Sequence, residues 1–245
     1  GGYVALNQHL WMHSPEGKVY YTTDGSDPRL PAGASASDAL VTLLTEDAPK
    51  RVLVPSVANG GNQLGNAPAA FTVTYYKAGG TVDSLTTAEQ VISDARQRIA
   101  TATEQATVIN YFNTGDEGHF GNNRPFPGTQ MNVDVENFVI LVTGKVLIPS
   151  AGPWTFGVNS DDGFGMTLKR GNRTYTMSYA SPRSPGDTLE VFNIAEAGQY
   201  DLRLVFYEQG GGSELELFAA PGSRNTFSET HFRLVGDITR GGLQV

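Results

Sequence analysis

The sequence predicts a mainly β protein made of two β-sandwiches and one connecting helix. Short segments rich in β-branched and aromatic residues recur along the chain and are separated by turn residues, which is typical of sandwiches and barrels. The 245 residues include 29 Gly and 13 Pro, a composition that favours turns. Only one segment carries apolar residues at helical spacing, and it follows a Gly-containing linker at residues 77–80.

Residues 1–77 are expected to form the first, smaller sandwich. Strands are predicted at Lys18–Thr23, Arg51–Pro55 and Ala70–Tyr76, with turn residues between them. The segment Val19–Arg29 (VYYTTDGSDPR) resembles the immunoglobulin-like module found at the C-terminus of chitobiases and β-hexosaminidases. The resemblance implies an accessory module that has no catalytic residues of its own.

Residues 78–104 are expected to hold a linker and the helix that connects the two domains. Six apolar residues recur at helical spacing: Leu85, Ala88, Val91, Ile92, Ala95 and Ile99. Thr86 and Glu89 have the spacing of a capping box, so we place the helix at about residues 86–98. We expect it to lie against a sandwich or to bridge the two domains. A membrane-surface helix is the alternative, but the apolar face is largely alanine and the polar face is mixed in charge.

Residues 105–238 are expected to form the second, larger sandwich. Its predicted strands are Val108–Phe112, Phe138–Ile148, Trp154–Val158, Phe164–Leu168, Gln199–Tyr207 and Ser213–Phe218. Two longer loops are expected, one at residues 113–128, which are rich in Gly and Pro, and one at residues 170–187.

The composition argues against nucleic-acid binding and against thiolate chemistry. The formal net charge is −8, and a field of that sign repels nucleic acid and anionic membranes. The chain has no cysteine, so a metal site would use oxygen or imidazole ligands, and the four histidines are scattered. No apolar run approaches the roughly 20 residues that span a bilayer. The chain begins Gly1-Gly2-Tyr3, and we interpret it as a monomeric piece of a larger exported protein.

Two adjacent acids, Asp161 and Asp162, lie between two predicted strands and are followed by Gly163. In an extended chain successive side chains point to opposite faces, so an ordinary Asp-Asp pair directs its carboxylates apart. Bringing both carboxylates to one point requires a distorted backbone, for which a cis peptide is the candidate. A bound cation would account for such a distortion. The alternative is a simple polar turn, since Asp and Gly favour turns.

The loop between the last two predicted strands contains Gln209 and three consecutive glycines, Gly210–Gly212. Glycine allows positive φ and a close approach of the backbone to a ligand, so carbonyl oxygens can turn inward. Calcium takes about 6–8 oxygens and suits such a loop better than magnesium does. The oxygens that could form this set belong to Asp161, Asp162, Gln209, Gly211 and Ser213, the last two through their carbonyls. The alternative is an unliganded, flexible hairpin tip.

Three segments carry a resemblance to a known family: Gly144–Phe164 (GKVLIPSAGPWTFGVNSDDGF), Ala197–Glu208 (AGQYDLRLVFYE) and Leu215–Gly222 (LELFAAPG). They resemble the protective-antigen-type (PA-fourteen) β-sandwich of bacterial toxins, glycosidases and adhesins, and the resemblance covers about residues 105–235. In lectin members of that family, a cis Asp-Asp pair and a later Asn- or Gln-bearing loop hold one calcium ion, which binds neighbouring hydroxyls of a sugar. Many other members carry the Asp-Asp-Gly sequence without known sugar binding, because the pair also serves the fold.

The resemblance therefore implies Ca²⁺ as a cofactor, held by Asp161, Asp162, Gln209, Gly211 and Ser213. It implies sugar contacts at Asp161, Asp162, Gly210, Gly211 and Gly212. Side chains of the two longer loops, such as His119 and Tyr179, could flank the ion.

The predicted function is that of a calcium-dependent, lectin-like module of a secreted or cell-surface adhesion protein, with a glycan or simple sugar as its partner. The alternative is a structural or protein-interaction module in which calcium only stabilises loops. We expect no enzymatic activity, because the chain has no nucleophile elbow, phosphate loop or dinucleotide motif. Adjacent carboxylates also cannot serve as a glycosidase pair, whose members stand roughly 5–10 Å apart.

Overall fold

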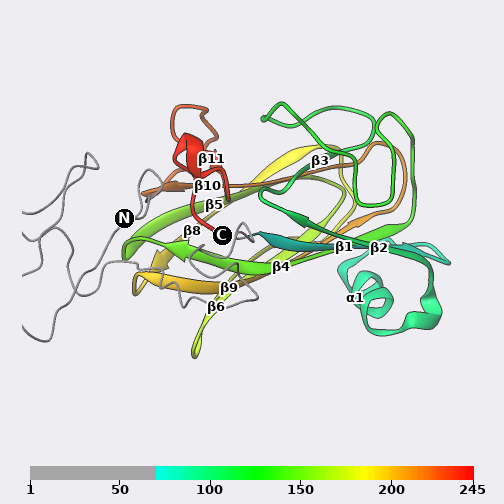
Figure 1. Ribbon diagram of the computed structural model, residues 1–245, viewed down its shortest axis with the longest axis horizontal. Coiled ribbons are helices and arrows are strands. Elements are labelled where there is room, and N and C mark those ends of the chain that lie inside the picture. Colours follow the sequence, from blue (N-terminus) through cyan, green and yellow to red (C-terminus); the bar gives the residue numbers. More distant parts are fainter. Residues whose placement is uncertain (1–69) are drawn as a thin grey trace, which may run out of the picture. The chain divides into compact units, whose positions relative to one another are not determined.

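Residues 70–245 are described by the computed structural model, and they belong to a unit that spans Ala67–Val245 (Figure 1). The immunoglobulin-like module expected at residues 1–77 lies almost entirely outside the described residues, and so do its first two predicted strands. That part of the sequence analysis stays a prediction.

Two antiparallel sheets form the described unit (Figure 1). The strand order is β2-β1-β4-β9-β6-β7 in the six-stranded sheet and β11-β10-β5-β8 in the five-stranded sheet, where β3 also pairs with β10. The strands are β1 (Phe71–Ala78), β2 (Arg98–Ala106), β3 (Asn110–Phe112), β4 (Phe138–Ile148), β5 (Gly152–Asp161), β6 (Phe164–Arg170), β7 (Arg173–Tyr179), β8 (Gly186–Ile194), β9 (Gly198–Glu208), β10 (Glu214–Pro221) and β11 (Arg233–Leu234). The prediction of a mainly β sandwich is confirmed.

The main hydrophobic core lies between the sheets and follows from the alternation of apolar residues along each strand. On β5, Phe156 and Val158 are fully buried in this core. On β9, Leu204 and Phe206 are buried in the same core, and the next position on that face is Glu208. The core face of β9 therefore ends in a buried acid, and the candidate site lies at this end of the sandwich.

The α-helix of the described residues, α1 (Leu85–Ser93), lies on the outer face of the six-stranded sheet (Figure 1). Ala88 and Val91 are buried there against three residues of β4 and β9, namely Val139, Val205 and Tyr207. The helix thus takes one of the two positions expected for it, against a sandwich. No helix among residues 70–245 is long and apolar enough to cross a membrane.

Both ends of α1 differ from the sequence prediction of residues 86–98. The N-cap is Ser84, whose Oγ accepts a hydrogen bond from the Thr87 amide at 3.2 Å. The helix ends before Asp94, which is extended and caps a short 3-10 turn, Ala95–Gln97. Strand β2 then begins at Arg98, so the apolar Ile99 belongs to a strand and is 70% exposed. Its match to the helical period was coincidental.

Strand β1 differs from the sequence analysis in its partner. The segment was assigned to the first module, whereas in the structure β1 pairs with β2 and β4 inside the six-stranded sheet. Phe71, Val73 and Tyr75 are buried in the core between the sheets. Their alternation predicts a strand with one buried face, but alternation does not reveal which sheet receives that strand.

The loop expected at residues 170–187 contains all of β7 and the start of β8. Strand β7 is an edge strand, and only Met177 among its seven residues is buried. Its sequence does alternate, since Tyr175, Met177 and Tyr179 are separated by Thr176 and Ser178. The strand signal was therefore present, and the sequence analysis wrongly assigned the segment to a loop.

Candidate functional site

Asp161 and Asp162 lie at the turn between β5 and β6, and the peptide bond between them is cis, as expected from the sequence. Each of the two side chains contributes a carboxylate oxygen to a group that also includes Glu208, the last residue of β9. The three contributing oxygens all lie within 4.8 Å of one another. Among residues 70–245 this is the one group of three or more acidic or histidine side chains close enough to hold a metal ion.

The backbone around the Asp pair is fixed by close contacts. The Ser160 hydroxyl donates to the Asp162 carbonyl at 2.7 Å. A Cβ on Gly163 would lie 2.6 Å from the Tyr207 ring and 2.8 Å from the Tyr179 carbonyl oxygen. The third position of the Asp-Asp-Gly sequence must therefore be glycine, because there is no space for a Cβ at residue 163.

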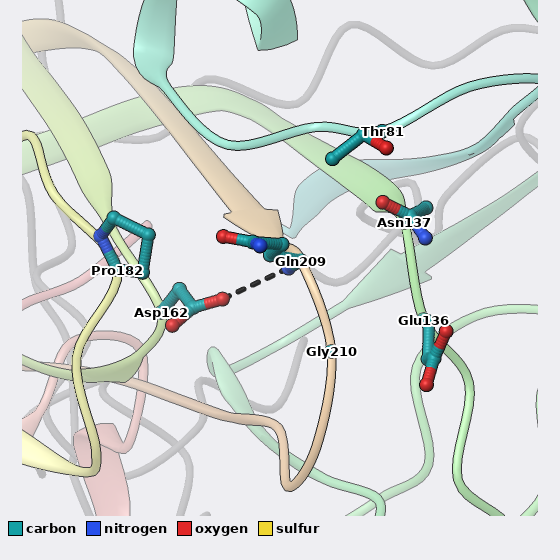
Figure 2. Close-up of a pocket in the computed structure, with 7 residues that line it drawn as sticks. All are labelled: Thr81, Glu136, Asn137, Asp162, Pro182, Gln209 and Gly210. Atoms are coloured by element: carbon teal, nitrogen blue, oxygen red, sulfur yellow. Dashed lines mark hydrogen bonds between the residues drawn. The ribbon is translucent and has the colours of Figure 1, made fainter.

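The Asp162 carboxylate joins three separate segments of the chain. Its Oδ1 accepts a hydrogen bond from the Arg183 amide at 2.9 Å. Its Oδ2 accepts one from the Gln209 amide at 2.8 Å, which is the dashed line in Figure 2. These bonds connect the β5–β6 turn to the segment between β7 and β8 and to the glycine-containing loop. Asp162 is only 5% exposed, and both of its oxygens are held in place.

Glu208 was not among the metal ligands predicted from the sequence. It is fully buried, and neither of its carboxylate oxygens has a hydrogen-bond partner within residues 70–245. The signal for it was present, because Leu204, Phe206 and Glu208 occupy alternate positions of one strand and so share its core-facing side. An acid that continues a buried apolar face requires a partner.

The electrostatics of the three acids call for a positive charge. Burial, together with the Asp162 charge, raises the pKa of Asp161 to about 7. Burial and the charges of Asp162 and Asp161 raise the pKa of Glu208 to about 10. A carboxylate set of this kind fits a hard divalent cation such as Ca²⁺, which prefers oxygen ligands and offsets their mutual repulsion.

The loop Gln209–Ser213 is held against the segment that follows β3. The Ser213 amide donates to the Thr114 carbonyl, and the Ser213 carbonyl accepts from the Asn113 amide, each at 3.0 Å. A Cβ on Gly212 would lie 2.7 Å from the Thr114 oxygen. Gly211 has a φ of +100°. Gly212 therefore serves a close packing of two backbones, while Gly211 supplies the positive φ of the loop. The Ser213 Oγ is buried in this loop without a partner among residues 70–245.

A pocket with a volume of about 420 Å³ opens beside this group (Figure 2). Its lining residues are Thr81, Glu136, Asn137, Asp162, Pro182, Gln209 and Gly210. All of them lie in connections between helices or strands, and none is basic. Two of the predicted site residues besides Asp162, namely Gln209 and Gly210, thus line the pocket.

The two longer loops contribute differently than expected. The guanidinium of Arg183 lies 4.2 Å above the ring of Tyr179 and donates to the Ser160 carbonyl at 3.1 Å, so this pair adjoins the Asp turn. His119 instead stacks on Phe227 with 3.6 Å between ring centroids and hydrogen-bonds Asp187. Its ring is occupied by these contacts on the outer side of the five-stranded sheet.

Comparison with known proteins finds no matching family model and no matching curated protein. Among solved structures, the PA14 domain of the antifreeze protein MpAFP is similar: it shares 19% identity, covers 69% of this chain and 88% of that chain, and has a TM-score of 0.52. A PA14 sugar-binding domain from an RTX adhesin shares 18% identity over 67% of this chain and 98% of its own, with a TM-score of 0.44. The Epithelial Adhesin 6 A domain from Candida glabrata, solved with Galb1-3GlcNAc, shares 12% identity over 73% of this chain and 92% of its own, with a TM-score of 0.45.

At these identities the likeness concerns the arrangement of the strands and not the chemistry of the site. The similarity to the MpAFP domain agrees with the two antiparallel sheets and with the resemblance found in the sequence. The described part of the chain has the fold of a PA14 domain.

Proposed function

We propose that this chain is a calcium-dependent carbohydrate-binding module of a larger exported protein. One observation carries the proposal: the carboxylates of Asp161, Asp162 and Glu208 converge within 4.8 Å at the edge of a polar pocket. The PA14-type fold and the family resemblance of the Asp pair support the same reading. The proposed ligands are these three acids with Gln209, Gly211 and Ser213, and the proposed sugar contacts are Asp161, Asp162 and Gly210–Gly212.

The chain's own residues would position the sugar as follows. Asp162 is fixed by two backbone amides, so the site needs little rearrangement when a ligand arrives. The bound calcium would accept two neighbouring sugar hydroxyls in place of water. Glu136 and the Gln209 side chain line the same pocket and would hydrogen-bond the remaining hydroxyls (Figure 2).

The test is a sugar-binding measurement with and without calcium. A glycan array read in Ca²⁺ and in chelator identifies a ligand, and calorimetry then measures its affinity. We expect binding in Ca²⁺, loss of binding in chelator, and loss of binding in Asp162→Asn. Asp201→Asn is the matched control, since Asp201 is exposed and pairs with Lys145 on the sheet surface. Glycan binding that survives both the chelator and Asp162→Asn would refute the proposal.

A second candidate function rests on the bonds of Asp162, which tie three connections together. An ion at this site would stiffen the loops of a structural or protein-interaction module. Calcium-dependent melting without glycan binding supports this alternative. The module is proposed to bind without turnover, and hydrolysis of glycosides by the chain would show the opposite.

A further inference from the structure

A second buried acidic cluster lies on the outer face of the five-stranded sheet. Leu215 and Leu217 of β10 face the core, so Glu214 and Glu216 project from the opposite side. The register places Asn110 of β3 on one side of Glu216 and Asn159 of β5 on the other. We call these four residues, Glu214, Glu216, Asn110 and Asn159, the Glu214 cluster. Each is at most 5% exposed.

The segment after β3 closes over this cluster. The amides of His119 and Phe120 donate to the two Glu216 oxygens at 2.9 and 2.7 Å. A Cβ on Gly118 would lie 2.3 Å from Glu214 Oε1 and 2.5 Å from Glu216 Oε2. The two carboxylates therefore approach the same point of the backbone, and only glycine fits there.

Four oxygens of the cluster are buried and find no hydrogen-bond partner among the described residues: both oxygens of Glu214, Asn110 Oδ1 and Asn159 Oδ1. The orientation of each amide is fixed by the acceptor at its other end. Asn159 Nδ2 donates to the Asp187 carboxylate at 2.9 Å, and Asn110 Nδ2 donates to the Gly121 carbonyl at 3.0 Å. Turning either amide over would place oxygen against oxygen, so both Oδ1 atoms remain acceptors that lack a donor.

In the described part of the chain, no basic side chain supplies the missing partner. The positive charge of Arg183 acts on Glu214, but its guanidinium donates to Ser160 and Thr188 and makes no hydrogen bond to Glu214. A proton on Glu214 would supply one donor for four acceptors. A single cation can be shared by several oxygen ligands at once and also offsets the repulsion between the two carboxylates.

We propose that the Glu214 cluster is a second binding site for a hard divalent cation of the Ca²⁺ type, held by Glu214, Glu216 and the Asn159 side-chain oxygen. Two carboxylates match the charge of such an ion, and amide oxygens complete an all-oxygen set. The site is separate from the Asp161-Asp162-Glu208 group. The two adjoin at Asp161, which the register places opposite Glu214. An ion here would fix the segment 117–120 to the sheet. It would also fix Glu214, the residue that lies opposite Asp161 in the register, and so help to position Asp161.

The experiment counts calcium ions bound per chain. The full chain is stripped with chelator and titrated with Ca²⁺ alone, by calorimetry and by native mass spectrometry. We expect two ions for the wild type and for the control Asp201→Asn. We expect one ion for Asp162→Asn and one for Glu214→Gln, which keeps the shape of the side chain and removes its charge.

The wild type and Asp162→Asn decide the question even where Glu214→Gln does not fold. One ion in the wild type and none in Asp162→Asn would overturn the second site, and a proton or a buried water would then fill the cluster, while the proposed function would stand. Two ions that persist in a folded Glu214→Gln would also overturn it. One ion that Asp162→Asn retains and Glu214→Gln loses would support the second site and contradict the first.

Discussion

Glu208 ends the core-facing side of β9 with a carboxyl group where the preceding residues are apolar. Its burial without a hydrogen bond destabilises the metal-free protein, whereas an ion at the Asp pair would turn the same carboxylate into a stabilising ligand. A residue of this kind lowers the stability of the metal-free protein because its position serves the binding site. Substitutions at this position should therefore act in opposite directions with and without calcium.

We expect Glu208→Gln to stabilise the metal-free protein and to reduce the additional stability that calcium confers. With a pKa of about 10, Glu208 is protonated in the folded protein at neutral pH and must release that proton on unfolding. Gln needs no proton, so the substitution should add about 1–3 kcal/mol to the free energy of unfolding in chelator at neutral pH. The rise in melting temperature on adding Ca²⁺ should shrink at the same time. Thermal melts of both proteins, each with and without Ca²⁺, check the prediction. Equal calcium-induced shifts would mean that Glu208 is not a ligand.

Gly163 is a second position where the addition of a single carbon atom should change the stability of the fold. We expect Gly163→Ala to lower the free energy of unfolding by about 1–3 kcal/mol, because the added methyl meets the Tyr179 carbonyl, which cannot rotate away as a side chain can. Gly80→Ala is the control, since nothing lies within 4 Å of its Cβ position. Urea denaturation measures both variants, and similar midpoints for the two would contradict the packing described around the turn.

At the scale of the elements, helix α1 is held on the sheet by its buried face and not by its exposed charges. Val91 is 2% exposed within the cluster that joins the helix to β4 and β9. Glu89 pairs with Arg203 of β9 at 2.6 Å, and both side chains are substantially exposed. Exposed ion pairs of this kind contribute little, since water and salt screen them.

We expect Val91→Ala to cost about 2 kcal/mol of unfolding free energy, from two lost methylene equivalents and the resulting cavity. Glu89→Gln should cost less than about 1 kcal/mol. Chemical denaturation of the two variants compares them directly. A larger loss for Glu89→Gln would show that charge, and not burial, attaches the helix.

At the scale of the whole molecule, acidic charge is both a global and a local feature. The chain carries a formal net charge of −8, and the pocket is lined by Glu136 and Asp162 without a basic residue. Even with one divalent ion beside it, the pocket environment is dominated by carboxylates. A negatively charged sugar would approach against this field.

We expect neutral glycans to bind at least about tenfold more tightly than the same glycans carrying a carboxylate, which corresponds to about 1.4 kcal/mol. Glu136→Gln should narrow the difference while leaving calcium dependence intact. Calorimetry on matched neutral and acidic oligosaccharides is the measurement. Preference for the acidic member of a pair would contradict the electrostatic argument.

The sequence predicted the sandwich well where one strand face is apolar, as in β4, β9 and β10, and it predicted the Asp turn through its unusual pair of acids. It could not predict that Phe71, Val73 and Tyr75 join the second domain, because pairing between distant strands leaves no local pattern. It missed Glu208 as a ligand because its importance lies in burial at the end of the core. The sequence could also not identify Thr81 and Glu136 as pocket residues, since tertiary structure alone brings them near Asp162.

The lining of the pocket comes entirely from the connections after β1, before β4, after β5, after β7 and after β9. None of these positions supports the hydrophobic layer between the sheets. Exchanging side chains such as Thr81 or Pro182 should therefore redirect which ligand is recognised without loss of fold. Proteins with this same fold could in this way bind different ligands through different pocket side chains.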